Sequence, residues 1–282
     1  MHKLLRNSYT RRLRRLVTGA RLRAFPSKAP TAQAPACNIC GHRLVVPLEV
    51  FSDREARSCV VCGSTLRFRA IMAALQSSLD GDHQVRVLER LPRCKHLKGI
   101  GMSDTGSYAG TLKSRFDYTN TFFHTEPLLD IRSPARHLIG QFDFVVSSDV
   151  LEHVDGPPQR AFSNLRALLK PGGILVFTVP YGAEQETVEH YPELHDYRIE
   201  GEGDMRVLIN VTTDGREQRF TDLCFHGGDG STLELRRFAY PHLIRLLEAA
   251  GFKDIRVHDV DHPEWGIVHQ AKEGLPITAT AA

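Results

Sequence analysis

The chain has 282 residues, of which 41% are hydrophobic and 24% charged, and its formal net charge is +3. This length suits one good core plus a small appendage, and the composition is that of an ordinary soluble protein. The sequence contains no run of eighteen apolar residues, which excludes a transmembrane helix, and no apolar secretory signal at its N-terminus, so we expect a cytoplasmic protein.

The positive charge is concentrated at the N-terminus. Residues 1–28 carry nine Lys or Arg and no acid, which leaves 27 basic against 33 acidic residues in the remainder. The body therefore has no basic surplus for following a phosphate backbone. The basic stretch is compatible with a disordered solvated tail, with a contact to an anionic membrane or nucleic acid, or with an organellar transit peptide. A linker rich in Pro, Ala and Ser completes the segment 1–36.

Four of the six cysteines form two pairs, each followed by glycine: Cys37, Cys40, Cys59 and Cys62. The C-x-x-C pairs, eighteen residues apart, match the zinc-ribbon spacing, in which each pair reaches one ion from a tight turn. Two disulfides or four free thiols are the alternatives, and a reducing compartment weakens the first. The sequence predicts a zinc-ribbon-like module at 37–66 with a structural Zn²⁺, because four sulfur ligands leave no position for water. Cys94 and Cys224 stand alone and favour buried thiols.

The segment 67–270 reads as an α/β domain. A helix with apolar residues from Phe68 to Leu79 on one face would dock the ribbon onto it. Val85–Glu89 is predicted as the first strand and Lys98–Asp104 as the second, each ending in an acid. Tyr118–Glu126 is an alternative second strand, which would make Glu126 its terminal acid.

The clearest unit lies between residues 142 and 180. An apolar strand from Phe142 ends in Ser147, Ser148 and Asp149, and a helix up to Leu169 follows. Pro171, Gly172 and Gly173 end that helix, and a second apolar strand runs from Ile174 to Val179. Strand, helix, turn and strand make one unit of a parallel sheet, so we expect a doubly wound Rossmann-like fold with ligands at the carboxyl ends of its strands.

The rest of the chain is divided into three parts. Residues 181–235 form a long polar insertion with a hairpin expected around Asp214-Gly215. A helix through Leu247 follows, Gly251 is its predicted C-terminal stop, and a strand covers 254–260. Residues 271–282 are interpreted as a tail.

The sequence of the central unit resembles class I S-adenosylmethionine-dependent methyltransferases. The matching motifs are Phe142-Asp-Phe-Val-Val followed by Val150-Leu-Glu-His-Val154, and Leu168-Leu-Lys-Pro-Gly-Gly173. The resemblance extends from about Val85 to Val260 and is closest to a bacterial group with Gly99 to Asp104, Tyr118 to Pro127, Asp130-Ile131 and His226 to Gly230. It implies methyl transfer from S-adenosylmethionine to an unidentified acceptor.

The resemblance also implies where the cofactor lies. An acid that ends the first strand of such proteins corresponds to Glu89, but the glycine-rich loop expected after it is replaced by Arg90 to Cys94 with Pro92. Asp104 corresponds to the acid that accepts hydrogen bonds from the ribose hydroxyls, unless it caps a helix, and Asp130 to the acid beside adenine. Ser147, Ser148 and Asp149 complete the expected cofactor site.

Histidines supply the candidates for a catalytic base. His153 and His226 rank first, because one ends the fourth strand of the family pattern and the other precedes glycines that let backbone approach a ligand. His124 and His190 are further candidates, and each is more readily a structural, hydrogen-bonded residue. The insertion would close over the acceptor.

Three functions remain open from the sequence. The preferred one is methylation of a small molecule or saccharide-linked metabolite, given the acidic body. The second is RNA methylation, because some rRNA methyltransferases carry a four-cysteine module and the basic tail would help binding. The third is a catalytically silent binding protein, which the missing glycine loop suggests.

Overall fold

The computed structural model describes residues 34–47, 50–51, 53–79, 84–226 and 232–282, apart from the side chains of Asp204 and His226. Residues 34–282 form one compact unit, so the cysteine pairs and the α/β sheet fold together. The predicted basic tail lies outside the described residues. Within the described part of the chain, no helix is long and apolar enough to cross a membrane.

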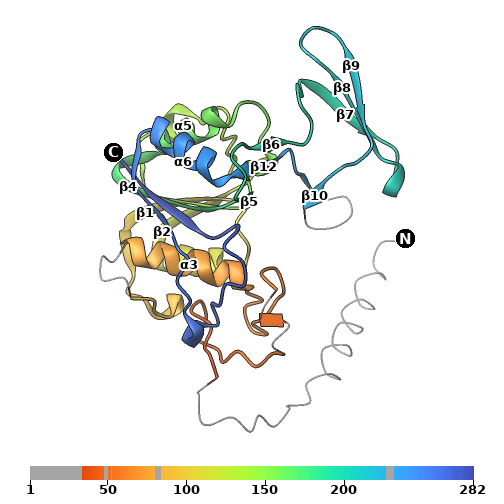
Figure 1. The fold of residues 1–282 in the computed structure, drawn as a ribbon. Coiled ribbons are helices and arrows are strands. Elements are labelled where there is room, and N and C mark those ends of the chain that lie inside the picture. Colours follow the sequence, from red (N-terminus) through yellow and green to blue (C-terminus); the bar gives the residue numbers. More distant parts are fainter. Residues whose placement is uncertain (1–33, 48–49, 52, 80–83, 227–231) are drawn as a thin grey trace, which may run out of the picture. The chain divides into compact units, whose positions relative to one another are not determined.

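A six-stranded sheet, ordered β13-β14-β4-β3-β1-β2, is the centre of the fold (Figure 1). Neighbours among β1 to β4 pair in parallel, whereas β14 is antiparallel to both β4 and β13. The strands are β1 Cys94–Met102, β2 Phe116–Thr121, β3 Phe142–Ser148, β4 Leu169–Thr178, β13 Phe252–Val257 and β14 Ile277–Ala281. This mostly parallel sheet confirms the predicted fold class.

Helices cover both faces of the sheet. Figure 1 shows α5 and α6 on one side and α3 on the other. The helices are α3 Leu66–Leu79, α4 Ala109–Arg115, α5 Pro158–Leu168 and α6 Tyr240–Ala249, and short 3-10 turns occur at Leu88–Arg90, Arg136–Leu138, Leu151–His153, Gly203–Met205 and Pro263–Trp265. Gly251 follows α6 with φ +87°, which fits its predicted role as the stop.

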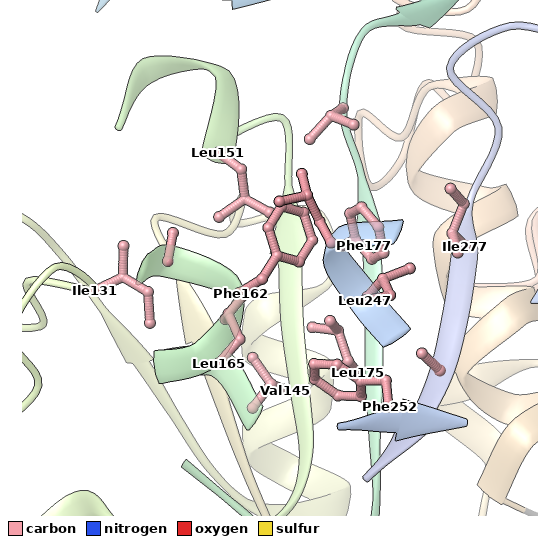
Figure 2. Close-up of a cluster of buried hydrophobic side chains, with 14 of the residues drawn as sticks. Ile131, Val145, Leu151, Phe162, Leu165, Leu175, Phe177, Leu247, Phe252 and Ile277 are labelled. Carbon is pink, nitrogen blue, oxygen red and sulfur yellow. The ribbon is translucent and has the colours of Figure 1, made fainter. Parts of the chain in front are cut away.

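Alternate residues of each central strand enter different cores. In β3, Val145 packs with Phe162 and Leu165 of α5, while Val146 packs with Ile71 of α3. Figure 2 shows the first of these cores, in which α5 and the sheet meet α6 and β14. A strand buried on both faces has the continuous apolar run that the sequence displays from residue 142.

The segment 85–89 is not the first strand, and this prediction was wrong. Leu88 and Glu89 donate backbone hydrogen bonds to the carbonyls of Asn38 (2.7 Å) and Ile39 (3.1 Å) in the first cysteine turn. The apolar residues Val87 and Leu88 are buried there. The first strand of the sheet is therefore β1, which overlaps the predicted second strand over residues 98–102. The second is β2, which overlaps the alternative at 118–126 only up to Thr121, so Glu126 does not end this strand.

The insertion contains three small sheets. One is β5 Tyr181–Gly182, β12 Arg236–Ala239 and β6 Val188–Glu189; the second is β7 Asp196–Glu200, β8 Val207–Val211 and β9 Glu217–Phe220; the third is β10 Phe225–His226 and β11 Thr232–Leu233. The turn between β8 and β9 contains Gly215 at φ +83°, as the hairpin prediction required. These short pieces explain why the sequence shows little periodicity here.

The end of the chain belongs to the sheet instead of forming a tail. β14 lies between β4 and β13, with Ile277 opposite Phe177 and Thr280 opposite Ile174. Leu275, Ile277, Ala279 and Ala281 are buried. Small residues and threonines gave no strong apolar signal, so only the pairing partners reveal this strand.

We predict that Ile277→Ala lowers the free energy of unfolding by about 2–5 kcal/mol, because it empties a fully buried site between β4 and β13. Thr280→Ala, on the same strand but partly exposed, should cost less than about 1 kcal/mol. Urea unfolding of both variants measures this, and equal small losses would contradict the position of β14 within the core.

Candidate active site

A cavity of about 1450 Å³ lies where the parallel strands end. Met102 and Ser103 from β1, Thr121 from β2, Ser148 from β3 and Pro180 after β4 all line it. The carboxyl ends of four strands thus open into one space, where ligands of doubly wound sheets bind.

A second wall comes from the segment around the second cysteine pair. Arg54, Glu55, Arg57 and Arg67 line the cavity, although they precede the sheet in sequence. Glu55 accepts two hydrogen bonds of 2.7 Å from Arg67, at Oε1 and Oε2. The position of these residues in the cavity was not predicted from the sequence, because only tertiary contacts bring them to the sheet.

Asp149 links the two walls. Its carboxylate accepts two 3.0 Å hydrogen bonds from Arg54 and lies 3.2 Å from Nε of Arg67, and the Thr178 hydroxyl donates to it at 2.6 Å. Burial alone would raise the pKa of Asp149, but the two arginines outweigh it and lower the pKa. The carboxylate therefore stays ionised and is largely occupied by protein donors.

On the opposite side, Arg132 is held between two acids. Its guanidinium lies 2.8 Å from Asp130 and 2.7 Å from Asp155, and 5.1 Å from the ring centroid of Phe123. The hydrogen bond from Arg132 lowers the pKa of Asp130. Asp130 and Ile131 line the cavity, and a contact of Asp130 with adenine stays a prediction.

Asp104 is buried and does not line the cavity. Tyr108 donates a 2.7 Å hydrogen bond to one carboxyl oxygen and Tyr118 donates to the other. Burial raises the pKa of Asp104 to about 7 despite these bonds. A carboxyl already engaged by two phenols does not face a ribose, so the structure does not support the predicted role.

Of the other predicted cofactor residues, some line the cavity and others do not. Ser148 and Asp149 line the cavity with Asp130, whereas Ser147 is fully buried behind them and Glu89 is exposed beside the first cysteine turn. Glu89 lies elsewhere because β1, not the segment 85–89, is the first strand. Ser103 replaces it at the cavity, with φ +57° just after β1.

His153 lies in the cavity wall, in the turn that follows β3. The carbonyl of Leu233 accepts a 2.7 Å hydrogen bond from its Nδ1. A carbonyl cannot donate, so the neutral ring carries its proton on Nδ1 and Nε2 is the basic nitrogen. This tautomer is the one a general base at Nε2 requires.

The remaining histidines differ in position. His124 is exposed and lines the cavity, whereas His190 is bonded to Glu234 at 2.9 Å and does not line it. The backbone of His226 pairs with Thr232, but its side chain and residues 227–231 lie outside the described residues. The role of His226 as a base stays a prediction.

The insertion forms the last wall, as the sequence analysis expected. Tyr197 and Ile199 of β7, Thr232 and Leu233 of β11, and Leu235 line the cavity. The Leu235 amide donates to the carbonyl of Glu152 at 2.9 Å, which ties this wall to the turn that carries His153. This side of the cavity therefore consists of insertion residues.

The four paired cysteines converge, although far apart in sequence. Cys37 and Cys62 have sulfurs 3.7 Å apart and Cys40 and Cys59 3.6 Å apart, and all four sulfurs lie within 4.8 Å of one another. Tetrahedral zinc with 2.3 Å bonds requires sulfurs about 3.8 Å apart. Gly41 and Gly63 have φ +76° and +71° and donate to the carbonyls of Cys37 and Cys59. The donor set fits zinc.

Arg69 of α3 connects this cluster to the domain. Its fully buried guanidinium donates to the Ser58 hydroxyl at 2.8 Å and to the Gly266 carbonyl at 2.9 Å. Burial lowers its pKa, whereas the nearby cysteine thiolates oppose the shift. The Arg69 guanidinium thus lies buried beside the four-cysteine cluster.

Comparison with known proteins identifies the family to which the chain belongs. The sequence model of a family described as "Methyltransferase domain" matches residues 89–257, more than half of the chain. A search of the curated proteins finds no match.

Solved structures with similar folds have low sequence identity. The CMeT domain of the citrinin polyketide synthase is 15% identical, with 77% of this chain and 53% of that chain covered and a TM-score of 0.41. An amino pentose methyltransferase from Micromonospora echinaspora is 17% identical, with 78% and 93% covered and a TM-score of 0.42. A Burkholderia thailandensis 1,6-didemethyltoxoflavin-N1-methyltransferase is 16% identical, with 76% and 88% covered and a TM-score of 0.37. The chain thus spans about half the length of the first of these.

We predict that Asp104 makes stability depend on pH. Burial raises the folded pKa of Asp104 to about 7, above its usual value of 3.8, so its contribution is fully present below about pH 4 and is lost as the pH rises through 7. Between pH 5 and 8 the wild type should lose about 2–3 kcal/mol more unfolding free energy than Asp104→Asn. Chemical unfolding at both pH values tests this, and parallel profiles would contradict a buried, protonated Asp104.

Proposed function

The chain belongs to the methyltransferase domain family, and we propose that it transfers a methyl group from S-adenosylmethionine to a small molecule or a saccharide-linked metabolite. The observation that carries this proposal is the cavity at the ends of β1 to β4, with walls from the cysteine segment and the insertion. Both neighbouring segments enclose the site, as expected for an acceptor of limited size.

The volume supports two ligands. A pocket for one drug-sized ligand measures about 300–1,000 Å³, and this cavity has about 1450 Å³. Cofactor and acceptor must lie together for an in-line displacement, because the protein mainly aligns the donor and the acceptor. One cavity of this size accommodates both.

The residues at the strand ends are the ones that would hold the cofactor. Ser103, Asp130 and Ser148 offer a hydroxyl or carboxylate beside the ends of β1, β2 and β3. When bound, S-adenosylmethionine supplies an electrophilic methyl group on a sulfonium. The chain itself would orient the acceptor with insertion residues such as Tyr197 and Thr232.

The charge pattern favours a small acceptor over RNA. Three of the cavity arginines are neutralised by acids: Arg54 by Asp149, Arg67 by Glu55 and Asp149, and Arg132 by Asp130 and Asp155. Binding to a phosphate backbone depends on cations that are available to replace counterions. Paired arginines do not provide this, so they shape the site and do not attract a polyanion.

His153 is the base we propose for acceptors that lose a proton. Its Nδ1 is held by the Leu233 carbonyl, so Nε2 accepts a proton in the neutral ring. Its carbonyl partner belongs to the insertion, so closure of the acceptor wall and orientation of the base are coupled.

We predict that the wild type binds S-adenosylhomocysteine in calorimetric titration and that His153→Gln retains this affinity within about threefold. Turnover should fall by about 10²–10⁴-fold, the usual contribution of a general base, when S-adenosylhomocysteine release is measured with a panel of sugars, phenols and amines. His137→Gln, on an exposed 3-10 turn outside the cavity, is the matched control and should behave like the wild type. No heat with the wild type would refute cofactor binding, and release stimulated only by RNA would refute the small acceptor.

We further propose that Cys37, Cys40, Cys59 and Cys62 hold one structural Zn²⁺. The sulfur spacing and the buried Arg69 beside the cluster support this. The module at 37–66 is too short to make a core of its own, and metal binding would supply folding free energy to it. Because its arginines line the cavity, the metal would also stabilise the active site.

We predict that Cys40→Ser contains about one zinc per chain less than the wild type, measured by elemental analysis after desalting, because three sulfurs bind zinc more weakly than four. Cys94→Ser, which removes a cysteine outside the cluster, should retain the wild-type content. The same zinc content in all three proteins would rule out a metal at the paired cysteines.

A further inference from the structure

A second group of metal-binding side chains lies in the insertion. One ligand atom each from His190, Cys224 and Glu234 lies within 4.8 Å of the other two, and His190 Nε2 is 2.9 Å from Glu234 Oε1. None of these residues belongs to the paired cysteines or lines the cavity. We propose that they form a second metal site, which binds Zn²⁺ and fastens the cavity wall made by the insertion.

The ligand types fit zinc. Imidazole nitrogen, thiolate and carboxylate are all zinc ligands, and three protein ligands leave one position for a water. Bonds of about 2.0–2.3 Å place tetrahedral ligand atoms about 3.3–3.8 Å apart. The 4.8 Å limit therefore requires only side-chain adjustment to reach that spacing.

The backbone around the three residues is already fixed. His190 follows β6, Cys224 precedes β10 and Glu234 follows β11. The His190 amide donates to the Leu235 carbonyl, and the Glu234 amide to the Cys224 carbonyl, both at 2.8 Å. Three segments distant in sequence thus present their ligands from a hydrogen-bonded frame, which lowers the entropy lost when a metal binds.

Burial of the carboxylate gives a reason for a cation. The side chain of Glu234 is only 6% exposed and that of His190 26%. A buried carboxylate is costly unless it is paired or coordinates a metal, and His190 is one of the partners of Glu234. A divalent ion would balance the carboxylate and the thiolate together, whereas His190 would remain neutral as a ligand.

The position of the site indicates its role. Glu234 lies between Leu233 and Leu235, which line the cavity, and the Leu233 carbonyl orients His153. Among the described residues, the apolar cluster that includes Leu233 and Leu235 also contains the buried Tyr191 and Leu208, with partly buried side chains packed against it. A metal would add to the stability of this cluster, as it does in small domains.

The test is zinc content of the full-length chain after incubation with excess Zn²⁺ and desalting. Cys224→Ala and Glu234→Gln should each contain one zinc less than the wild type, whereas the matched control Cys94→Ala should contain as much as the wild type. Equal zinc in all four proteins would overturn the proposal and leave a His190–Glu234 hydrogen bond beside a partly buried thiol. This count needs neither cofactor nor acceptor, so it stands or fails independently of methyl transfer.

Co²⁺ provides a second readout in case a substitution disturbs folding. Titration of the zinc-free chain with Co²⁺ should give thiolate-to-cobalt charge transfer from two separate sites. In Cys40→Ser, the absorption due to Cys224 should remain, and Glu234→Gln should weaken Co²⁺ binding at that site at least tenfold while the thiolate is kept. A single titration phase that is unaffected by Glu234→Gln would contradict the second site.

Discussion

The carboxylate of Asp149 and its two arginines hold the candidate active site together. Arg54 belongs to the segment between the cysteine pairs and Arg67 to the start of α3, whereas Asp149 directly follows β3. Each charge is costly to bury alone, so the three stabilise one another only when the cysteine module is in place. The module is thus a wall of the site, and its metal would act on the enzyme through these ion pairs.

Two aspartates near the same edge of the sheet have opposite electrostatic environments. Arginines keep Asp149 ionised, but Asp104 is surrounded by tyrosine hydroxyls, and burial raises its pKa to about 7. Asp104 therefore acts within the core as a hydrogen-bond acceptor that joins α4 and β2 to the end of β1. Sequence position alone cannot separate these roles, because both residues are aspartates that follow an apolar strand.

The sequence predicted what local patterns determine. The strand from Phe142 and the hairpin at Gly215 follow from residues adjacent in the chain, and the spacing of the cysteines indicated their clustering. The turn predicted at Pro171 was wrong, because Leu169–Thr178 is one strand, β4, with an irregular register near its start. The segment 85–89 was wrongly predicted as a strand of the sheet, because its backbone hydrogen bonds are made with Asn38 and Ile39. Strand β14 was not predicted, because its small residues are buried only through pairing with β4 and β13. The arginines that line the cavity could not be predicted either, since Arg54 and its partner Asp149 are 95 positions apart in the sequence.

The cavity combines two kinds of structure with different physical origins. Its floor is the end of a parallel sheet, which two apolar cores stabilise and which the family pattern describes. Its other walls come from the cysteine module and the insertion, which pack smaller apolar clusters against the domain. Ion pairs, hydrogen bonds and the proposed metals would add to these clusters. Because a carbonyl of the insertion also accepts a hydrogen bond from His153, the proposed function would make the choice of acceptor depend on the insertion and cofactor binding depend on the sheet.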